Sequence, residues 1–360
     1  MTYFFISESH IISRLVWRFY HWQNMINYKL WYTNDNKLLS VGKIMRLVVI
    51  LNVNPDSSIQ TKIIENREYT RNELRDILYK SFSKFIDEII FYDNFERFKK
   101  SVFNHLDDFV LNFDFGYNSR IRNMSVPAFC ENYKIKYFNP DPYVQVLCQD
   151  KFMTEKFAEN FGIKVPKSLL VFDHSYTKEI LANFEYPIII KPNYESESIG
   201  ITQNSIVENM EQADMVLKQL MKDFDGILVE EYIEGREVAI TILEYEGVLF
   251  FEEVELIFQE YSEFKYRAYT SEIKQKIGVD IEKSCYLSDK DIINLKQLYK
   301  NLSPNKLIRV DGRIKNAEFY LIEINANPGL YPKSVVPKTF NINGYTYDEM
   351  IQTLFTHHLN

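Results

Sequence analysis

Short apolar runs and longer amphipathic stretches alternate along the first part of the chain. The runs of strand length are RLVVILNV at 46–53, DEIIFYD, DDFVLNFD and the end of VPAFCENYKIKYFNP. The stretch from about 70 to 86 and the start of VPAFCENYKIKYFNP have the spacing of helices. RLVVILNV is apolar almost throughout, which is typical of a parallel strand covered on both faces. The alternation predicts an α/β domain with a parallel sheet at residues 46–146.

The pattern of apolar positions changes near residue 147. A helix in DKFMTEKFAENFGIKVP comes first, and we expect Gly162 to be its C-cap. The next segments predict strands in SLLVF and YPIIIKPN, a helix in NMEQADMVLKQLMKDF, a strand in GILVEEYI and a hairpin in REVAITILEYEGVLFFEEVELIF. The rest of the pattern predicts a helix at 288–302, the strand LIRVDGRIK, a second strand and a C-terminal helix. Antiparallel strands with helices are an α+β pattern, and we expect two such units, at 147–230 and 231–360.

Residues 1–45 form an N-terminal extension whose role the pattern leaves open. The segment HIISRLVWRFYHWQNM has apolar residues at positions 11, 12, 15, 19 and 22, which fit one face of a helix. Arg14, Arg18 and His21 lie among them, so one interpretation is a helix on a membrane surface. The other, which we favour, is an extension packed on its own body or on a second copy of the chain.

Composition and charge exclude several classes of protein. The chain has 360 residues, of which 46% are hydrophobic and 26% charged, as in soluble globular proteins. Its net charge of −8, without a dense Lys/Arg cluster, argues against nucleic-acid binding. The three cysteines are widely spaced, the N-terminus lacks a basic leader, and no apolar stretch reaches the roughly 18 residues of a membrane span. We therefore expect a cytoplasmic protein.

The segment LIEINANPGL at 321–330 contains polar side chains in an apolar strand. Glu323 and Asn325 are two residues apart and so face the same side. Asp311 is expected to end the preceding strand, and a hairpin would bring it beside Glu323, with Arg309 on the same face. One interpretation is a solvated sheet face. The other is a Mg²⁺ site, because two adjacent carboxylates repel each other unless a cation lies between them.

Two further segments have features of a nucleotide site. Lys191 ends the buried strand of IIIKPNYESESIG, and the following loop offers Ser196 and Ser198 as phosphate contacts, although its glutamates at 195 and 197 are unfavourable near phosphate. ILVEEYIEGREV is similar to a hinge whose backbone could pair with an adenine edge. The alternative is that Glu230 and Glu237 are ordinary surface acids.

Seven segments in order over residues 147–340 resemble the ATP-grasp superfamily, and within it D-alanine–D-alanine ligases. They are DKFMTEKFAENFGIKVP, YPIIIKP, ILVEEYIEGREV, FKY, IRVDGRI, FYLIEINANPGL and KSVVP. The resemblance implies an ATP-grasp fold, here α+β, preceded by the parallel α/β domain, the pre-ATP-grasp domain of such enzymes. It also implies ATP and Mg²⁺ as cofactors and small carboxylate and amine substrates. A homodimer is compatible with the resemblance and with the apolar N-terminal segment.

The resemblance implies a role for each matching residue. On the nucleotide side, the phosphates are held by Lys151, Lys191 and, from a mobile loop, Lys265; the adenine hinge is Glu230, Glu231, Tyr232 and Ile233; and the ribose acid is Glu237. On the substrate side, the Mg²⁺ ligands are Asp311, Glu323 and Asn325; the arginine at the acyl phosphate is Arg309; and the contacts to the substrate carboxylate and the oxyanion are Gly329 and Ser334.

The chain departs from the family pattern near the substrates. Glu197 stands where a serine is usual, NVNPDSS lacks the glutamate that reads the first D-alanine, and LNFDFGYNSR replaces the later glycine-rich elements. The loops that would choose the substrate offer Asp56, Ser57 and Ser58, then Asn112, Asp114 and Asn118 to Arg120. We therefore expect an ATP-dependent carboxylate–amine ligase that acts through an acyl phosphate on an amino-acid-like substrate other than D-alanine. The alternatives are a D-alanine–D-alanine ligase of cell-wall synthesis and a non-catalytic nucleotide-binding regulator.

Overall fold

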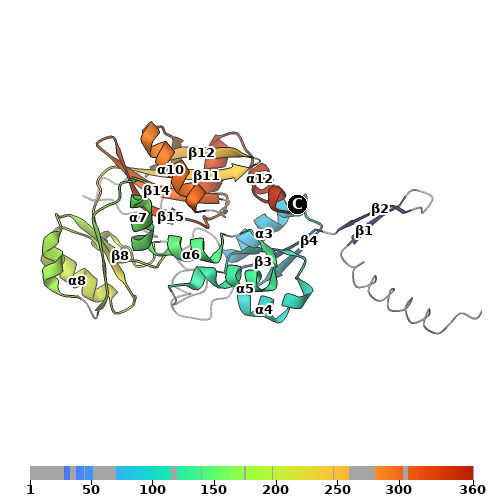
Figure 1. Ribbon diagram of the computed structural model, residues 1–360, viewed down its shortest axis with the longest axis horizontal. Coiled ribbons are helices and arrows are strands. Elements are labelled where there is room, and N and C mark those ends of the chain that lie inside the picture. The colour runs from blue at the N-terminus through green and yellow to red at the C-terminus, as the bar shows by residue number, and fades with distance from the viewer. Residues whose placement is uncertain are drawn as a thin grey trace, which may run out of the picture.

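The computed structural model describes residues 28–32, 38–43, 45–51, 70–114, 120–138, 140–173, 176–196, 198–245, 247–258, 280–302 and 307–359. The described strands form four sheets, and three of them, with their helices, make up the body of the molecule (Figure 1). The fourth is an antiparallel pair of β1 (Tyr28–Tyr32) and β2 (Leu38–Lys43) in the N-terminal extension. The sequence did not predict this pair, and the helix expected at 11–22 lies outside the described residues.

The first sheet of the body is parallel throughout, as predicted. Its order β4-β3-β5-β6 comprises β4 (Glu88–Tyr92), β3 (Arg46–Ile50), β5 (Phe109–Asn112) and β6 (Lys136–Tyr137). Its helices are α3 (Arg71–Phe82), α4 (Phe95–Lys100) and α5 (Ser125–Tyr133). Leu47 and Val49 pack on one face in the core that includes α3, whereas Val48 and Ile50 pack on the other face with α4 and α5. This double coverage explains why β3 is apolar after its first residue.

The second sheet is antiparallel and lies at the left of Figure 1. Its order β7-β10-β8-β9 comprises β7 (Ser168–Val171), β10 (Ile227–Glu231), β8 (Ile188–Pro192) and β9 (Ile206–Val207). α8 (Met210–Leu220) packs against it through Ala213 and Leu217, which are fully buried with Ile188 and Ile190 of β8. The strands and the helix predicted for this region are confirmed.

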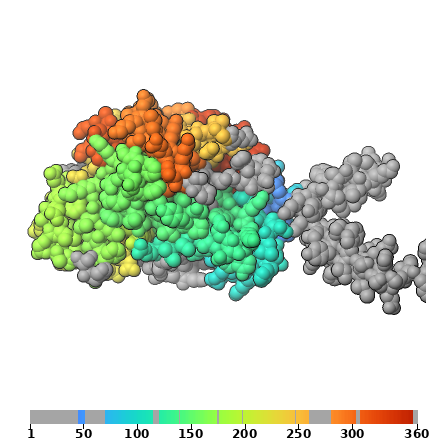
Figure 2. All heavy atoms as spheres, viewed as in Figure 1, coloured from blue at the N-terminus to red at the C-terminus, as the bar shows by residue number. Residues whose placement is uncertain are grey.

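The third sheet is also antiparallel. Its order β13-β12-β11-β14-β15 comprises β13 (Asp280–Lys283), β12 (Val248–Ile257), β11 (Arg236–Tyr245), β14 (Leu307–Lys315) and β15 (Glu318–Asn325). The other α-helices in the described residues are α6 (Pro142–Gln149), α7 (Lys151–Glu159), α10 (Asp289–Asn301), α11 (Val335–Ile342) and α12 (Tyr347–Leu359). Val144 of α6, Ala158 of α7 and Leu295 of α10 share one core with this sheet. In the space-filling view the green atoms around α6 and α7 border all three parts of the body (Figure 2).

Two chain reversals expected from the sequence have a specific backbone geometry. The C-cap of α7 is Asn160 rather than the expected Gly162. Gly162 follows two residues later with φ 70°, and the Ile163 N–H donates back to the Ala158 carbonyl at 3.4 Å, so the glycine closes the turn after the helix. Asp311 does not end a strand, however, because β14 continues to Lys315. Between Asp311 and Gly312 the pairing skips Ile322 of β15, so the extra residue of this bulge belongs to β15 and β14 continues past it.

Candidate active site

One cavity lies between the second and third sheets and collects most of the residues that the sequence singled out. The predicted residues that line it are Lys151, Lys191, Ser196, Ser198, Glu230, Glu231, Tyr232, Ile233, Glu237, Arg309, Asp311 and Glu323. They come from α7, β8 and its following loop, β10 and the hinge after it, and β11, β14 and β15. Segments far apart in the sequence therefore present these side chains to one space.

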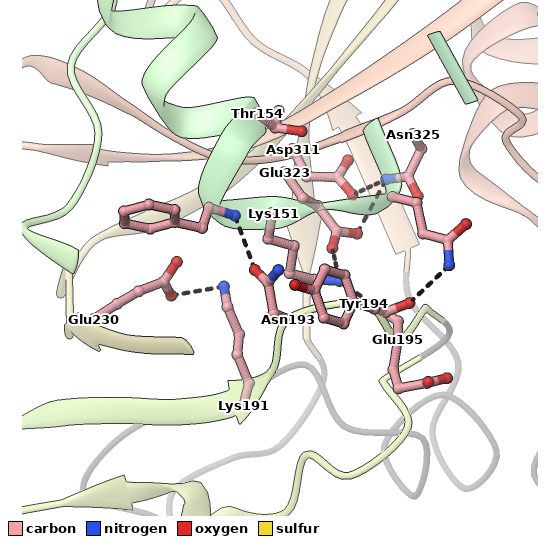
Figure 3. Close-up of polar contacts among 12 residues, drawn as sticks. Lys151, Thr154, Lys191, Asn193, Tyr194, Glu195, Glu230, Asp311, Glu323 and Asn325 are labelled. Carbon is pink, nitrogen blue, oxygen red and sulfur yellow. Dashed lines mark hydrogen bonds and ion pairs between the residues drawn. The ribbon is translucent and has the colours of Figure 1, made fainter. Parts of the chain in front are cut away.

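The β14–β15 hairpin holds four polar side chains on one face, as strand alternation predicted. Asp311 pairs with Glu323 across the two strands, and Arg309 pairs with Asn325. The Asn325 amide donates to Asp311 Oδ2 at 2.9 Å and to Glu323 Oε1 at 3.0 Å (Figure 3). Arg309 donates two hydrogen bonds to the Asp311 carboxylate, at 2.7 and 2.6 Å. The hairpin therefore places two carboxylates, an amide and a guanidinium side by side.

Glu323 is ionised in this setting. Burial alone would raise its pKa, but the positive charges of Lys151, Arg309 and Lys191 and the hydrogen bond from Asn325 outweigh burial and lower the pKa to about 2. Glu323 is thus a carboxylate over the whole physiological pH range. It faces into the cavity beside cationic groups, so the interpretation as a solvated sheet face does not describe it.

The donor atoms of this hairpin fit a hard divalent cation. Two carboxylates from paired strands and an amide are oxygen ligands of the type that Mg²⁺ takes, usually with water and phosphate oxygens. The amide of Asn325 presents its nitrogen to both carboxylates in the structure, so it would have to rotate to offer its oxygen. Among the described residues there is no metal-binding group of three or more His, Cys, Asp or Glu side chains.

Two buried lysines line the cavity, one from α7 and one from β8. Lys151, the first residue of α7, donates to the Glu195 carbonyl and lies 3.8 Å from Glu323 Oε2. Burial lowers the pKa of Lys151. The nearby charge of Lys191 acts in the same direction, and the carboxylate of Glu323 acts against it. Lys191 lies near the end of β8 and forms an ion pair with Glu230 at 2.6 Å. Burial would lower the pKa of Lys191, but the acidic neighbours outweigh this effect and raise it.

Glu230 is therefore directed toward Lys191 rather than toward solvent. A second acid, Glu155 of α7, lies beside it and was missed by the sequence analysis. Glu155 is fully buried and accepts a hydrogen bond from the Ser168 hydroxyl. Burial and the neighbouring Glu230 raise the pKa of Glu155 to about 10, so it is protonated at neutral pH. Its spacing of four residues from Lys151 in one helix was the signal that could have found it.

The loop after β8 is fixed at its start and supported by an arginine that the sequence analysis missed. Asn193 donates to Asp150 at 2.7 Å and accepts from the Phe152 N–H at 2.9 Å, which ties the loop to the start of α7. Arg122 donates to both oxygens of Glu195, at 3.0 and 3.1 Å, and to the Tyr194 carbonyl at 2.9 Å.

This pairing resolves the concern about an acid near phosphate, because the charge of Glu195 is balanced by Arg122. Ser198 and Gly200 have left-handed backbones, with φ of 63° and 75°, of the kind found in anion-binding nests. Ser196 and Ser198 line the cavity, whereas Glu197 lies outside the described residues.

The hinge after β10 reaches the cavity through Tyr232 and Ile233. The backbone N–H groups of Glu231 and Tyr232 donate to the carbonyls of Lys167, at 2.9 Å, and Pro187, at 3.1 Å. These two N–H groups are therefore used within the fold, and any adenine contact must come from other atoms of the hinge.

On the substrate side, the structure brings Gly329 and Ser334 together. A side chain at Gly329 would lie 3.1 Å from the Ser334 hydroxyl, so glycine allows this close approach. Ser334 is the N-cap residue of α11, yet its side chain makes no capping hydrogen bond. Ser334 precedes Val335, which lines the cavity.

The loops expected to choose the substrate are described only in part. Asn112 and Asp114 are used within the fold: the Asn112 amide bonds to the Asp114 backbone, and Asp114 accepts from the Phe95 N–H at 2.9 Å. Arg120 lies over the Tyr194 ring, 5.2 Å from its centre, beside the loop after β8. The predictions for Asp56, Ser57, Ser58, Asn118 and Lys265 fall outside the described residues.

Comparison with known proteins agrees with this geometry. The family model described as D-ala D-ala ligase C-terminus matches residues 158–356, more than half of the chain. The D-alanine–D-alanine ligase of Petrotoga mobilis is 29% identical over 259 residues, covering 69% of this chain and 79% of that protein. That of Fervidobacterium nodosum is 27% identical over 288 residues, covering 75% and 87%.

Solved structures share the fold. D-alanine–D-alanine ligase from Bacillus anthracis, complexed with ATP, has a TM-score of 0.65 at 20% identity and covers 88% of this chain and 97% of its own. VanG D-Ala:D-Ser ligase from Enterococcus faecalis has a TM-score of 0.61 at 21% identity, covering 88% and 100%. The fold is that of ATP-grasp enzymes, as predicted. The chain belongs to the D-alanine–D-alanine ligase family and is an ATP-grasp ligase that forms C–N bonds.

Proposed function

We propose that this chain joins a carboxylate to an amine at the expense of ATP, through an acyl phosphate, and that its substrate is amino-acid-like but not D-alanine alone. The observation that carries the proposal is that Lys151, Lys191, Asp311 and Glu323 line one cavity. A polyphosphate with its divalent ion requires cationic side chains for the phosphates and carboxylates for the metal, and this cavity offers both. ATP binding by the B. anthracis relative supports the same use of the cavity here.

Each residue has a role in the proposed reaction. Lys151 and Lys191 hold phosphate oxygens, while the hinge and Glu237 bind adenine and ribose. Asp311, Glu323 and Asn325 would hold Mg²⁺, which supplies positive charge to the transferring phosphoryl group when bound. Lys265 would act from a closing loop on the γ-phosphate. These assignments come from the family resemblance and from the positions of the described side chains.

The chemistry proceeds in two displacements. A carboxylate oxygen of the first substrate attacks the γ-phosphorus, and ADP leaves. The amine of the second substrate then attacks the carbonyl carbon, loses a proton, and expels phosphate that retains the carboxylate oxygen. Arg309 would stabilise the charge on the acyl phosphate and the tetrahedral intermediate, with Gly329 and Ser334 at the substrate carboxylate and oxyanion. We assign ATP binding to residues 147–230 and 231–360, and part of the substrate site to residues 46–146.

The substrate proposal rests on the loops of the first unit. The loop NVNPDSS lacks the glutamate of the family and offers only Asp56 nearby, and Asn112 and Asp114 are used within the fold. The VanG relative is named a D-Ala:D-Ser ligase, which supports the use of this fold for a pair other than two D-alanines. A D-alanine–D-alanine ligase of cell-wall synthesis is the alternative. A nucleotide-binding regulator is disfavoured because Lys151, Lys191 and both carboxylates of the hairpin are retained.

The test is ADP release with ATP, Mg²⁺ and a panel of amino acids, followed by mass analysis of the products. We expect an amide product with at least one amino acid other than D-alanine, and little dipeptide from D-alanine alone. Glu323→Gln keeps the shape of the side chain but removes its charge, and should abolish turnover while the protein stays folded. Rapid D-alanyl-D-alanine formation would contradict the substrate proposal, and ADP release without any amide would contradict the ligase proposal.

A further inference from the structure

Arg313 of β14 is a buried cation at the nucleotide end of the cavity. Arg313 is 8% exposed and lines the same cavity as Lys191 and Asp311. The guanidinium donates to the Ile233 carbonyl at 2.7 Å and forms an ion pair with Glu237. It also lies against the Tyr232 ring, 4.7 Å from the ring centre.

These contacts join two parts of the predicted nucleotide site. Tyr232 and Ile233 belong to the hinge, and Glu237 is the acid expected at the ribose. Glu237 and Arg313 are also direct cross-strand partners between β11 and β14, so the register of the sheet creates their contact. One side chain from the metal-binding hairpin therefore fixes the hinge and the ribose acid together.

The buried charge of Arg313 depends on its contacts with Ile233, Glu237 and Tyr232. The guanidinium of Arg313 is charged, because arginine is always protonated in proteins. A buried charge is stable only when it is paired and its donors are used. The planar guanidinium can serve a carbonyl, a carboxylate and an aromatic face at once, which a lysine cannot do equally well.

We propose that Arg313 is a positioning residue for the nucleotide sugar. It holds Glu237 through Oε1, and the second carboxylate oxygen is the acceptor for a ribose hydroxyl. Arg313 acts through Glu237 and the hinge, and its expected effect is on selectivity for the sugar. The inference rests on the proposed function, because it requires that the cavity bind ATP.

A purely structural role makes a different prediction. If Arg313 only connects β11 to β14, its replacement lowers the stability of the protein and reduces the affinity for every nucleotide by the same factor. If it positions Glu237, its replacement specifically removes the preference for nucleotides that carry both sugar hydroxyls. The ratio of affinities for ATP and its deoxy forms therefore separates the two roles.

The experiment is calorimetric titration with ATP, 2′-deoxy-ATP and 3′-deoxy-ATP, without amino acids, so that no turnover is needed. The variants are Arg313→Met, Arg313→Lys and Glu237→Gln. Arg236→Met is the matched control, because Arg236 lies in the same region but has a mostly exposed side chain paired with Glu255. Thermal unfolding checks that each variant is folded.

We expect wild type and Arg236→Met to bind ATP about fivefold or more tightly than at least one deoxy form, as expected for one hydrogen bond to a charged group. Arg313→Met should reduce this ratio to within about twofold, and Arg313→Lys should give an intermediate ratio. In a Glu237→Gln background, Arg313→Met should change the ratio no further, because both act at one contact.

An unchanged ratio in Arg313→Met contradicts the inference while leaving ATP binding and the ligase proposal intact. If Arg313→Met does not fold, an unchanged ratio in Arg313→Lys has the same force. A wild-type protein that binds no ATP contradicts the proposed function and the inference with it. ATP binding with the predicted ratios, but without amide formation, supports the role of Arg313 and contradicts only the ligase chemistry.

Discussion

At the scale of single residues, Glu155 is a fully buried acid whose neighbouring lysine, Lys191, forms its ion pair with another acid, Glu230. Glu155 lies next to that pair. Within the described part of the chain, Oε1 of Glu155 and Oε1 of Glu230 are both buried without a hydrogen-bond partner. A proton on Glu155 placed between the two oxygens would satisfy both.

This proton makes stability depend on pH. The pKa of Glu155 is about 10 in the folded protein, above the ordinary value of 4.5, so the folded state holds a proton that the unfolded state releases. Stability from this group is complete below pH 4.5 and falls as pH rises toward 10, by at most about 1.4 kcal/mol per pH unit.

Glu155→Gln should therefore flatten this decline and stabilise the protein by about 1–2 kcal/mol at pH 8, because glutamine keeps a donor for Glu230 without a titrating proton. Urea unfolding between pH 5 and 9 measures the effect. Glu159→Gln, at an exposed position of the same helix, is the control and should leave the slope unchanged. Equal pH slopes for wild type and Glu155→Gln would show that Glu155 is not protonated.

Strand alternation predicts some of the site residues and could have predicted one more. It places Arg309 with Asp311 and Glu323 with Asn325, because side chains two apart in a strand share a face. The same alternation continues to Arg313, which lies two residues after Asp311 and so on the same face, and this spacing was the missed signal. Arg122 could not be found this way, because its partner Glu195 is 73 residues away and belongs to another sheet unit.

At the scale of elements, a bulge in β15, opposite Asp311 and Gly312 of β14, sets the register of the hairpin. Most strands and helices followed from apolar spacing alone, but Asp311 was expected to end a strand that in fact continues to Lys315. In the structure a side chain at Gly312 would lie 2.2 Å from the Phe319 ring and 2.7 Å from the Tyr320 carbonyl. The glycine is therefore needed for close packing of β15, a tertiary requirement that a local pattern does not reveal.

Gly312→Ala should test the importance of this packing. The added methyl group has no room, so we expect a loss of about 1–3 kcal/mol in the free energy of unfolding. Because the bulge lies opposite Asp311, turnover should fall as well. Chemical denaturation and steady-state assays measure the two effects, with Lys315→Ala at an exposed position of the same strand as the control. Wild-type stability in Gly312→Ala would mean that β15 can shift freely.

At the scale of the whole molecule, the site depends on contacts between parts that are distant in sequence. Arg122 follows β5 of the first sheet in sequence, whereas Tyr194 and Glu195 follow β8 of the second. The ion pair of Arg122 with Glu195 connects the first unit to the loop expected to bind phosphate.

No helix in the described part of the chain is long and apolar enough to cross a membrane. The boundaries at 46, 147 and 231 remain predictions.

Reversing the charges of this connection should test it. Arg122→Glu and Glu195→Arg should each weaken ATP binding by about tenfold, because the loop loses its support. The double variant restores an opposite-charge pair and should recover part of the affinity. Arg120→Gln, which changes a more exposed arginine near the same loop, should have a smaller effect. Additive losses in the double variant would show that the pair does not hold the loop.

The central claim is that ATP activates a carboxylate as an acyl phosphate, and isotope transfer tests it most directly. The amino acid that supports ADP release would be supplied with ¹⁸O in its carboxylate, and the phosphate released would be analysed by mass. The proposed reaction predicts one ¹⁸O in phosphate for each amide formed, together with unlabelled ADP. Amide formation with unlabelled phosphate, or with AMP that carries the label, would contradict it.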